Sequence, residues 1–371
     1  MITHLRANLW LLVLTVLLCS VLYPLLLLGI GQTVFPDKAQ GSLLTDAKGN
    51  PVGSRLIAQP FSQDQFFQPR PSAASYNAAA SGASNLSGSN YQLRDQVARR
   101  LGPIVKYQGG PKVGQLVAPD VESWFQKDQF DGKAGIVAQW ANLHNASAQN
   151  WIKNDMSGSA YGLNGKYVAE WQKSHKAEVD AEIARLDAWK KDNPDKPAPD
   201  PDKAWVKAWI AALSDPSAEP KPEDLAVSFF ISFSEDHPGM FPSAVEHKAA
   251  DGKTEKVVGP VKDGSDIQSA FFDMWLQEHP DADLEPVPAD MVTSSGSGLD
   301  PDITLSNARW QLNSRVAAAW AKKTGRSEQD LRGEIEKLLQ EKSAAPLGGL
   351  VGVPLVNVLE VNLALQERFE K

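Results

Sequence analysis

The sequence predicts an α+β fold, with one N-terminal transmembrane helix followed by a body of mixed helices and strands. Three observations support this class. Residues 9–30 form an apolar run that has no equal elsewhere in the 371 residues. Turn signals at residues 45–50 and 251–252 separate short strand-like segments. Several stretches in the middle and at the end of the chain carry apolar residues at helical spacing.

The apolar run Leu9–Ile30 contains 22 residues, eleven of them leucine. As a helix it extends about 33 Å, enough to cross a hydrocarbon core of about 30 Å. We therefore expect a transmembrane helix over residues 9–31. Pro24 lacks a backbone donor and can kink such a helix. The expected anchor residues are Trp10 near one interface and Leu14, Leu18, Pro24 and Leu28 within the span.

A cleaved signal peptide is the alternative reading of this run. The apolar part of a signal peptide is about 7–15 residues long and ends at a small-x-small cleavage site. This run is longer, and residues 31–36 contain no such site. Arg6 precedes the run, whereas the first charge beyond it is Asp37. Because positive charge favours the cytoplasmic side, we expect residues 1–8 in the cytoplasm and the body outside it.

Composition limits the class of partners. The net charge of −8 and the absence of a visible basic patch argue against nucleic-acid binding. The single cysteine, Cys19, lies within the apolar run, so the body contains no disulfide. A body of this length can bury its own core without one.

Residues 40–101 begin with an expected hairpin, in which Gly41–Leu44 and Val52–Ile57 flank the turn. Pro71–Asn90 is rich in small and polar residues and has no regular period, which predicts a loop. Asn90 can then cap a short helix. The apolar face expected for this helix consists of Leu93, Val97 and Leu101.

Residues 103–286 differ in composition from the segments on either side and contain eight of the eleven tryptophans. Ser174–Trp189 and Trp205–Leu213 have helical patterns, and the proline-rich, charged segment Lys190–Asp202 is expected to connect them. Ala244–Lys248 and Lys253–Val258 flank a turn at Asp251–Gly252 and predict a second hairpin.

Residues 287–371 begin with a Gly/Ser-rich loop, and a helix is expected over Ser306–Thr324. A second helix should begin at Ser327, with Asp330 completing a weak capping box. Residues 348–354 predict a short strand or turn. Asn357 and Glu360 form a capping box for a last helix. The residues expected to face inward are Leu331, Ile335, Leu338, Leu339, Leu359 and Leu363.

Motifs for common catalytic sites are missing from the sequence. Gly252-Lys253-Thr254 has the end of a phosphate-binding loop, but His247 occupies the position of its first glycine. No G-x-S-x-G occurs, and the six histidines show no metal-binding spacing. Lys323-Thr324-Gly325 lacks the preceding aspartate that P-type ATPases phosphorylate, because Lys322 stands there. We therefore expect no catalytic residue and no metal site.

The chain closely resembles the C subunit of the Kdp-type potassium-transporting ATPase in four features. They are the N-terminal span and the segments Gly53–Asn90, Val292–Ile303 and Val356–Leu365. The resemblance covers about residues 1–101 and 287–371. It implies a small core domain built from residues 32–102 and 287–371. Residues 103–286 would then be a mainly helical insertion of unknown role, whose ends lie close together so that the core can close.

The resemblance also implies a function. It predicts a single-pass accessory subunit of a bacterial inner-membrane complex, with a periplasmic body. In that family's complex a channel-like subunit binds K+ and a P-type ATPase subunit hydrolyses ATP. The C subunit is needed for assembly and acts as a catalytic chaperone that raises the ATP affinity of the ATPase subunit. The implied partners are these two subunits, a small fourth membrane subunit and the lipid bilayer, with ATP and K+ acting on the partners and no cofactor bound directly.

Two loops contain the candidate site residues: one for contact with a partner subunit or a nucleotide, and a second loop that carries the family resemblance. The first resembles the L-S-G-G-Q signature of ABC transporters, so direct nucleotide contact is one hypothesis and packing against a partner subunit is the other. A periplasmic loop cannot touch cytoplasmic ATP, which favours the partner. The first loop comprises Asn85, Leu86, Ser87, Gly88, Ser89 and Asn90. The second comprises Ser295, Gly296, Ser297, Gly298, Leu299 and Asp300.

The sequence also allows a function of a different class, in which the chain binds a ligand outside the cytoplasm. A membrane-anchored periplasmic binding protein or cell-envelope protein would hold a ligand site in residues 103–286. Clustered aromatic residues there suit a sugar or peptidoglycan ligand, although aromatics at helical spacing more often form a core. The residues concerned are Trp124, Trp140, Trp151 and Trp171.

Overall fold

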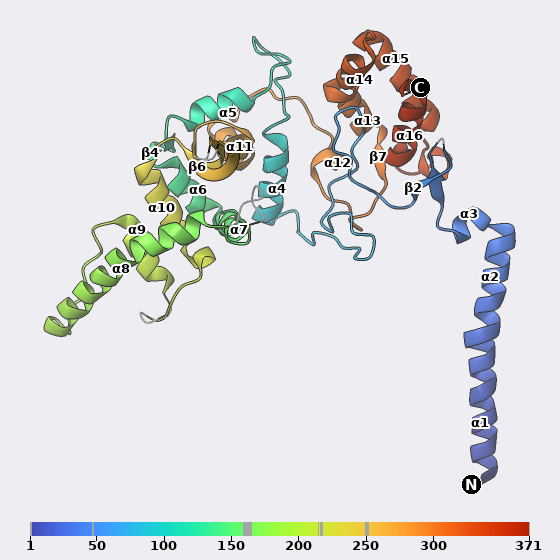
Figure 1. The fold of residues 1–371 in the computed structure, drawn as a ribbon, viewed down its shortest axis with the longest axis horizontal. Helices are drawn as coiled ribbons and strands as arrows, with labels where there is room; N and C mark the ends of the chain where they lie inside the picture. Colours follow the sequence, from blue (N-terminus) through green and yellow to red (C-terminus); the bar gives the residue numbers. More distant parts are fainter. Residues whose placement is uncertain are drawn as a thin grey trace. The chain divides into compact units, whose positions relative to one another are not determined.

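The computed structural model describes residues 2–46, 48–158, 165–213, 215, 218–248 and 252–370. The described chain mixes many helices with two-stranded sheets, which confirms the α+β class. It divides into two compact units, coloured along the chain in Figure 1. Unit 1 comprises Met1–Asn85 and Val287–Lys371, and unit 2 comprises Leu86–Pro286. The first boundary thus falls at Asn85, earlier than the expected residue 102.

The N-terminal helix consists of α1 (Ile2–Val16), the π-helical turn η1 (Leu17–Leu22) and α2 (Tyr23–Val34) (Figure 1). Its portion His4–Val34 is long and apolar enough to cross a membrane, and none of it is buried inside the protein. Pro24 accounts for the π turn, since its ring would clash with the carbonyl of Ser20, four residues earlier. The sequence indicated that Pro24 can kink the helix. In the structure the helix changes locally from α to π just before Pro24.

A short helix and a hairpin follow: α3 (Pro36–Ala39), β1 (Leu43–Thr45) and β2 (Pro51–Ser54). The strands are antiparallel, which confirms the expected hairpin. Asp46 accepts hydrogen bonds from the backbone N–H groups of Lys48 and Asn50, both at 2.8 Å. These bonds hold the pKa of Asp46 below its usual range, and the bond from Asn50 has the largest effect.

The rest of unit 1 is mainly helical. Residues from four of its helices and both strands of a small antiparallel sheet bury Trp320, Leu331, Ile335 and Val356 in one hydrophobic core. The elements are α12 (Ala289–Val292), β7 (Asp302–Thr304), α13 (Leu305–Gln311), η3 (Leu312–Val316), α14 (Ala317–Thr324), α15 (Glu328–Lys342), η4 (Pro346–Gly349), β8 (Leu355–Asn357) and α16 (Val358–Phe369).

Helix caps in unit 1 follow the sequence in part. The side chain of Asn357 accepts a hydrogen bond from the backbone N–H of Glu360 at 3.2 Å, as expected. The Glu360 carboxylate, however, forms an ion pair with Arg55. Ser327 precedes α15 but its side chain makes no capping bond, so the expected box with Asp330 is wrong. The four predicted inward residues of α15 are buried, whereas Leu363 of α16 is only half-buried.

Unit 2 consists of helices and a long hairpin, whose strands pair from Phe241–Val261 to Lys248–Thr254. The hairpin is confirmed, although Asp251 of its turn lies outside the described residues. The elements are α4 (Tyr91–Leu101), α5 (Ala118–Phe125), β3 (Gln129–Phe130), β4 (Lys133–Ala134), α6 (Ile136–Leu143), α7 (Asn145–Met156), α8 (Tyr167–Asp192), α9 (Ala204–Ala212), η2 (Pro222–Leu225), α10 (Ala226–Asp236), β5 (Phe241–Lys248), β6 (Thr254–Val261) and α11 (Ser265–Glu278).

Aromatic rings fill the core of unit 2. Phe271 of α11 lies 4.5 Å from Phe125 and 5.6 Å from Trp140, measured between ring centroids. Trp140 is fully buried and also meets Phe230 edge-on at 5.1 Å. The core therefore joins α5, α6 and α10 to α11.

Helix α4 belongs to this unit. Asn90 caps it as expected, accepting a hydrogen bond from the backbone N–H of Gln92 at 2.8 Å. Its buried residues are Asp95 and Ala98, whereas the predicted face of Leu93, Val97 and Leu101 is half-buried. The expected face contained apolar residues only, so it did not include Asp95.

The two ends of residues 103–286 lie side by side. The backbone N–H of Gln108 bonds to the carbonyl of Asp283 at 2.8 Å, and that of Glu285 bonds to the carbonyl of Lys106 at 2.9 Å. Tyr107 and Leu284 form an antiparallel bridge between these bonds. A segment inserted into another fold needs ends arranged in this way.

Candidate functional site

An extended segment, residues 66–69, leads into the first loop of unit 1, and two buried amide side chains hold it in place. Asn362 of α16 accepts from the N–H of Phe67 at 2.8 Å and donates to its carbonyl at 2.9 Å. Gln311 of α13 does the same for Gln68, at 2.8 and 2.9 Å. These side chains replace the partner strand that an extended segment otherwise needs.

Residues 70–82 and 294–300 then lie against each other, and we call them the paired loops. The Ser72 hydroxyl donates to the carbonyl of Gly298 at 2.6 Å. The carbonyl of Ser297 accepts from the N–H of Gly82 and from the Ser81 hydroxyl, both at 2.9 Å. The N–H of Ser295 donates to the carbonyl of Pro71 at 3.2 Å. Backbone groups of the two loops therefore satisfy each other without forming a regular sheet.

Gly298 is the point of closest approach between the paired loops. A Cβ atom there would lie 2.6 Å from the carbonyl oxygen of Gly82 and 2.9 Å from the Cβ of Ala74. The residue also has φ of +69°, a conformation that L side chains rarely adopt. Gly296, two residues earlier, has open space around its Cβ position. The contact between the loops therefore requires glycine at position 298 but not at position 296.

Arg70 links the paired loops electrostatically. Its guanidinium donates to the carbonyl of Ser294 at 3.2 Å and lies 3.5 Å from the carboxylate of Asp300. The Tyr76 hydroxyl donates to the Arg70 carbonyl at 2.9 Å. Nearby Asp302 accepts a hydrogen bond from the Asn357 amide at 3.1 Å, but burial raises the pKa of Asp302 above its usual range.

The predicted residues of the second loop all lie in or beside this contact. Ser295 and Gly298 are buried, Gly296 and Ser297 are exposed, and Asp300 is half-buried. The carbonyl of Leu299 accepts from the N–H of Ala58 at 2.9 Å. The second loop therefore contacts residues of the segment 58–82 in the same chain.

The predicted first loop lies beyond the paired loops, where the chain passes from unit 1 to unit 2. Asn85 has a positive φ of +53°. Ser87, Gly88 and Ser89 are exposed, and Leu86 is half-buried. The hydroxyls of Ser87 and Ser89 lie 3.1 Å apart, and Gly88 has nothing within 4 Å of its Cβ position. Residues 70–82 supply the hydrogen bonds to the second loop described above.

Sequence reasoning therefore missed the residues that join the two loops: Arg70, Ser72, Ser81 and Gly82. The signal was an arginine between two prolines, followed by serines that can bond to backbone groups. The outer surface of the paired loops carries small exposed side chains. They are Ala78, Ala79, Ala80, Ser81, Gly296 and Ser297. Such a surface can approach another backbone closely, and the described residues contain no His/Cys/Asp/Glu group able to hold a metal ion.

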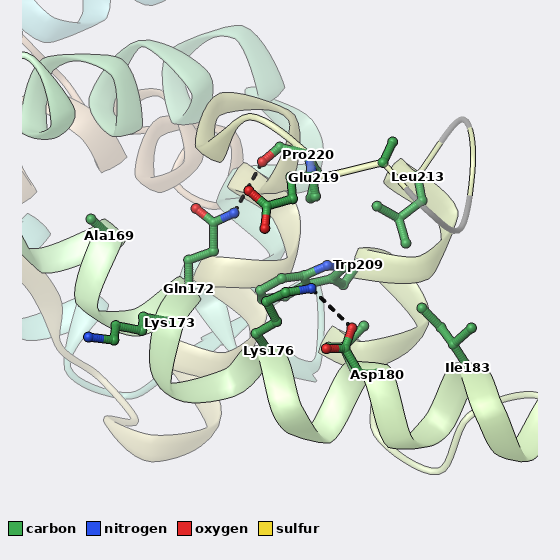
Figure 2. Close-up of a pocket in the computed structure, with 12 residues that line it drawn as sticks. Ala169, Gln172, Lys173, Lys176, Asp180, Ile183, Trp209, Leu213, Glu219 and Pro220 are labelled. Carbon is green, nitrogen blue, oxygen red and sulfur yellow. Dashed lines mark hydrogen bonds and ion pairs between the residues drawn. The ribbon is translucent and has the colours of Figure 1, made fainter.

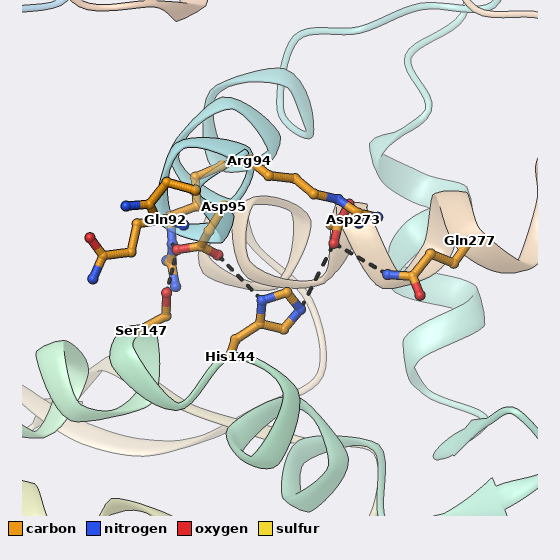
Figure 3. A network of polar contacts seen from close by, with 9 residues as sticks. Gln92, Arg94, Asp95, His144, Ser147, Asp273 and Gln277 are labelled. Atoms are coloured by element: carbon orange, nitrogen blue, oxygen red, sulfur yellow. Dashed lines mark hydrogen bonds and ion pairs between the residues drawn. The ribbon is translucent and has the colours of Figure 1, made fainter. Parts of the chain in front are cut away.

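Unit 2 contains a buried polar network around His144 (Figure 3). The imidazole lies between the carboxylates of Asp95 and Asp273, with each of its nitrogens 3.9 Å from one of them. Ser147 donates to Asp95. Arg94 pairs with Asp273 at 2.8 Å and Arg99 pairs with Asp95 at 3.2 Å. Burial lowers the pKa of His144 below its usual range, although the two carboxylates oppose this shift.

The four tryptophans considered for ligand binding contribute to the interior of unit 2. Trp140 is fully buried, Trp124 donates to Glu278 at 2.7 Å, and Trp151 stacks on Phe229. The ring centroids of Trp171 and Trp209 lie 5.1 Å apart. Beside Trp209 lies a cavity of about 280 Å³ (Figure 2), across which Gln172 donates to the Pro220 carbonyl at 3.1 Å.

Comparison with known proteins identifies the family. The family profile described as "KdpC: K+-transporting ATPase, c chain" matches residues 5–120 and 261–367, which is more than half of the chain. The chain belongs to this family. The expected resemblance is confirmed, and the matched residues include the helix at the N-terminus and both members of the paired loops.

Several curated relatives carry the name "Potassium-transporting ATPase KdpC subunit". The relative from Pseudomonas putida strain F1 is 47% identical over 111 residues, which is 30% of this chain and 60% of the relative. That from Pseudomonas aeruginosa strain PAO1 is 48% identical over 99 residues, 27% and 54% of the two chains. That from Methanosphaerula palustris is 53% identical over 81 residues, 22% and 44%. The chain thus spans about 60% or less of the length of these relatives.

The family match leaves residues 121–260 uncovered, a narrower segment than the expected 103–286. The matched helices α4 and α11 lie in unit 2 together with this uncovered segment. Asp95 and Asp273 belong to the matched helices, and His144 and Ser147 belong to the uncovered segment. Residues 121–260 therefore share a hydrophobic core and a polar network with helices α4 and α11, which the family profile matches.

Proposed function

We propose that this chain is an accessory subunit of an ATP-driven potassium uptake complex, anchored by its N-terminal helix. The observation that carries the proposal is the family match over residues 5–120 and 261–367. The helix His4–Val34, which is long and apolar enough to span a bilayer, supports membrane attachment. The proposed partners are a potassium-binding channel-like subunit, a P-type ATPase subunit and a small fourth membrane subunit.

In this proposal K+ and ATP act on the partner subunits, and the chain itself catalyses no step. It is needed for assembly and supports ATP binding by the ATPase subunit, as a catalytic chaperone. The paired loops support a docking role, because their exposed side chains are small and a partner backbone can approach them closely. Arg70 and Gly298 set the shape of that surface.

The body is proposed to lie on the periplasmic side of a bacterial inner membrane. Arg6 precedes the helix and Asp37 is the first charge after it, an asymmetry that favours a cytoplasmic N-terminus. It follows that the Asn85–Asn90 loop contacts a partner subunit and affects ATP affinity indirectly. The loop carries no charged side chain, which supports this choice over direct phosphate binding.

Cysteine labelling in intact cells tests the topology. The variant Cys19→Ser, Ser87→Cys places one thiol in the exposed first loop. We expect labelling by a membrane-impermeant thiol reagent without permeabilisation, at least when the partner subunits are absent. A matched variant, Cys19→Ser with Thr3→Cys, should be labelled only after permeabilisation. The reverse pattern would place the body in the cytoplasm and make direct nucleotide contact the better hypothesis.

A further inference from the structure

Unit 1 contains an apolar loop, residues 344–354, whose largest side chains face solvent. The exposed fractions are 75% for Leu347, 89% for Leu350 and 54% each for Val351 and Val353. Leu350 is the most exposed large apolar side chain in the described chain. Residues 344–356 contain no charged side chain and none that forms hydrogen bonds. Apolar surface of this kind usually marks a contact with a partner or with lipid.

The backbone holds the apolar loop in an outward-facing conformation. At its base, Ala344 and Leu355 exchange two backbone hydrogen bonds, at 3.0 and 2.9 Å. At its tip, φ is +49° at Leu347 and +90° at Gly349. A leucine with positive φ is uncommon, because its Cβ meets the backbone. The loop is therefore a built feature of unit 1, closed by a β-bridge and turned by left-handed residues.

The connections along the chain limit the distance between the apolar loop and the end of the N-terminal helix. The loop runs directly into β8, whose three residues extend about 10 Å. At the far end of β8, the Asn357 amide donates to the Arg55 carbonyl at 2.9 Å, and Arg55 pairs with Glu360. Arg55 follows the β1–β2 hairpin. The eight residues 35–42 that join α2 to this hairpin include helix α3, so they span less than a fully extended segment, which would reach about 29 Å.

We propose that the apolar loop enters the boundary between headgroups and acyl chains of the same bilayer that holds the N-terminal helix. Unit 1 is then held at the membrane at two points, the helix and the loop. A surface without charge or side-chain hydrogen bonds suits this boundary, where apolar side chains gain from leaving water. The proposal rests on the proposed membrane-spanning role of the helix.

The test places an environment-sensitive fluorophore on Leu350 in the full-length chain. The variant Cys19→Ser, Leu350→Cys is labelled with a nitrobenzoxadiazole probe and reconstituted into nanodiscs of phosphatidylethanolamine and phosphatidylglycerol. The matched control is Cys19→Ser, Gly333→Cys, because Gly333 is exposed on α15 with open space at its Cβ position. A probe on the native Cys19 reports separately whether the helix lies in the bilayer.

We expect the Leu350 probe to be quenched several-fold more by acyl-chain nitroxide lipids than the Gly333 probe, and several-fold less by aqueous iodide. Equal behaviour of the two sites, with the Cys19 probe quenched by lipid, would overturn the loop proposal and leave the anchor intact. An unquenched Cys19 probe would overturn the anchor itself and the loop proposal with it. Shielding of Leu350 that appears only after the partner subunits are added would instead assign the loop to a protein contact.

Discussion

At the residue scale, a few buried polar side chains determine the geometry of unit 1. Asn362 and Gln311 are almost fully buried, and each gives the extended segment 66–69 both a donor and an acceptor. An unpaired buried backbone group costs about 1–3 kcal/mol, so these amides stabilise the entrance to the paired loops. Sequence reasoning identified the loops by their small residues. It could not pair them, since nothing local in a Gly/Ser-rich segment specifies a distant backbone partner.

The contact at Gly298 gives a prediction with a matched control. Replacing Gly298→Ala should destabilise the paired loops by about 2–4 kcal/mol, from a left-handed conformation and an overpacked contact with Gly82. Hydrogen exchange of peptides covering residues 66–82 and 294–300, in the full chain in detergent, measures this. Gly296→Ala should leave exchange nearly unchanged, because its Cβ position is open. Similar exchange in the two variants would show that the loops do not pack as described.

His144 gives a prediction about pH. Burial lowers its folded pKa, so the unfolded chain, with a pKa near 6.5, binds the proton more readily. The stability of unit 2 should therefore fall as pH drops below about 6.5. The charged and polar groups around the His144 imidazole are Arg94, Asp95 and Arg99 of α4, Ser147 of α7, and Asp273 and Gln277 of α11.

The variant His144→Gln should reduce that pH dependence. Urea unfolding at pH 7.5 and 5.5 measures it, as the difference in free energy of unfolding between the two pH values. The variant His247→Gln, at an exposed position of β5, serves as the control and should behave like the unaltered chain. A His144→Gln variant that loses as much stability on acidification as the unaltered chain would contradict the assignment.

At the scale of elements, apolar periodicity and caps predicted helices α4, α8, α9 and α13 to α16, and turn signals predicted two hairpins, because these patterns are local. Helices α5, α6, α7, α10 and α11 of unit 2 were not predicted. The expected helix over Ser306–Thr324 is present, though the π turn η3 interrupts it. Local signals failed where a distant charge competed. Glu360 pairs with Arg55, and Asp95 turns inward to meet Ser147 and His144. A helix face defined by leucine and valine alone therefore left out Asp95, the buried residue through which α4 joins the polar network.

The N-terminal helix gives a prediction at this scale. We expect it to contribute to assembly as well as to tethering, since the π turn and Pro24 give it a particular shape. Replacing Leu9–Ile30 with an unrelated apolar helix of equal length should leave the body folded and exported but weaken co-purification with the partner subunits. A Pro24→Ala variant tests the shape alone. Unchanged complex yield and potassium uptake with the replaced helix would reduce it to a generic tether.

At the scale of the whole molecule, the family core was recognisable from sequence because its motifs are contiguous. The extent of the additional segment was not, since the family match reaches α4 and α11, which lie in unit 2. Residues 121–260 pack their aromatic rings against Phe271 of α11. Their removal would therefore expose part of a family helix, and the segment is best regarded as an enlargement of unit 2.

The central claim is that this chain is an accessory subunit of a potassium-transporting ATPase. The most direct measurement is K+-stimulated ATP hydrolysis by the cognate channel-like and ATPase subunits, purified with and without the chain, over a range of ATP concentrations. We predict that the chain co-purifies with them and that its omission raises the KM for ATP or abolishes K+-stimulated hydrolysis. Failure to co-purify, together with full K+-stimulated hydrolysis at an unchanged KM in its absence, would contradict the account.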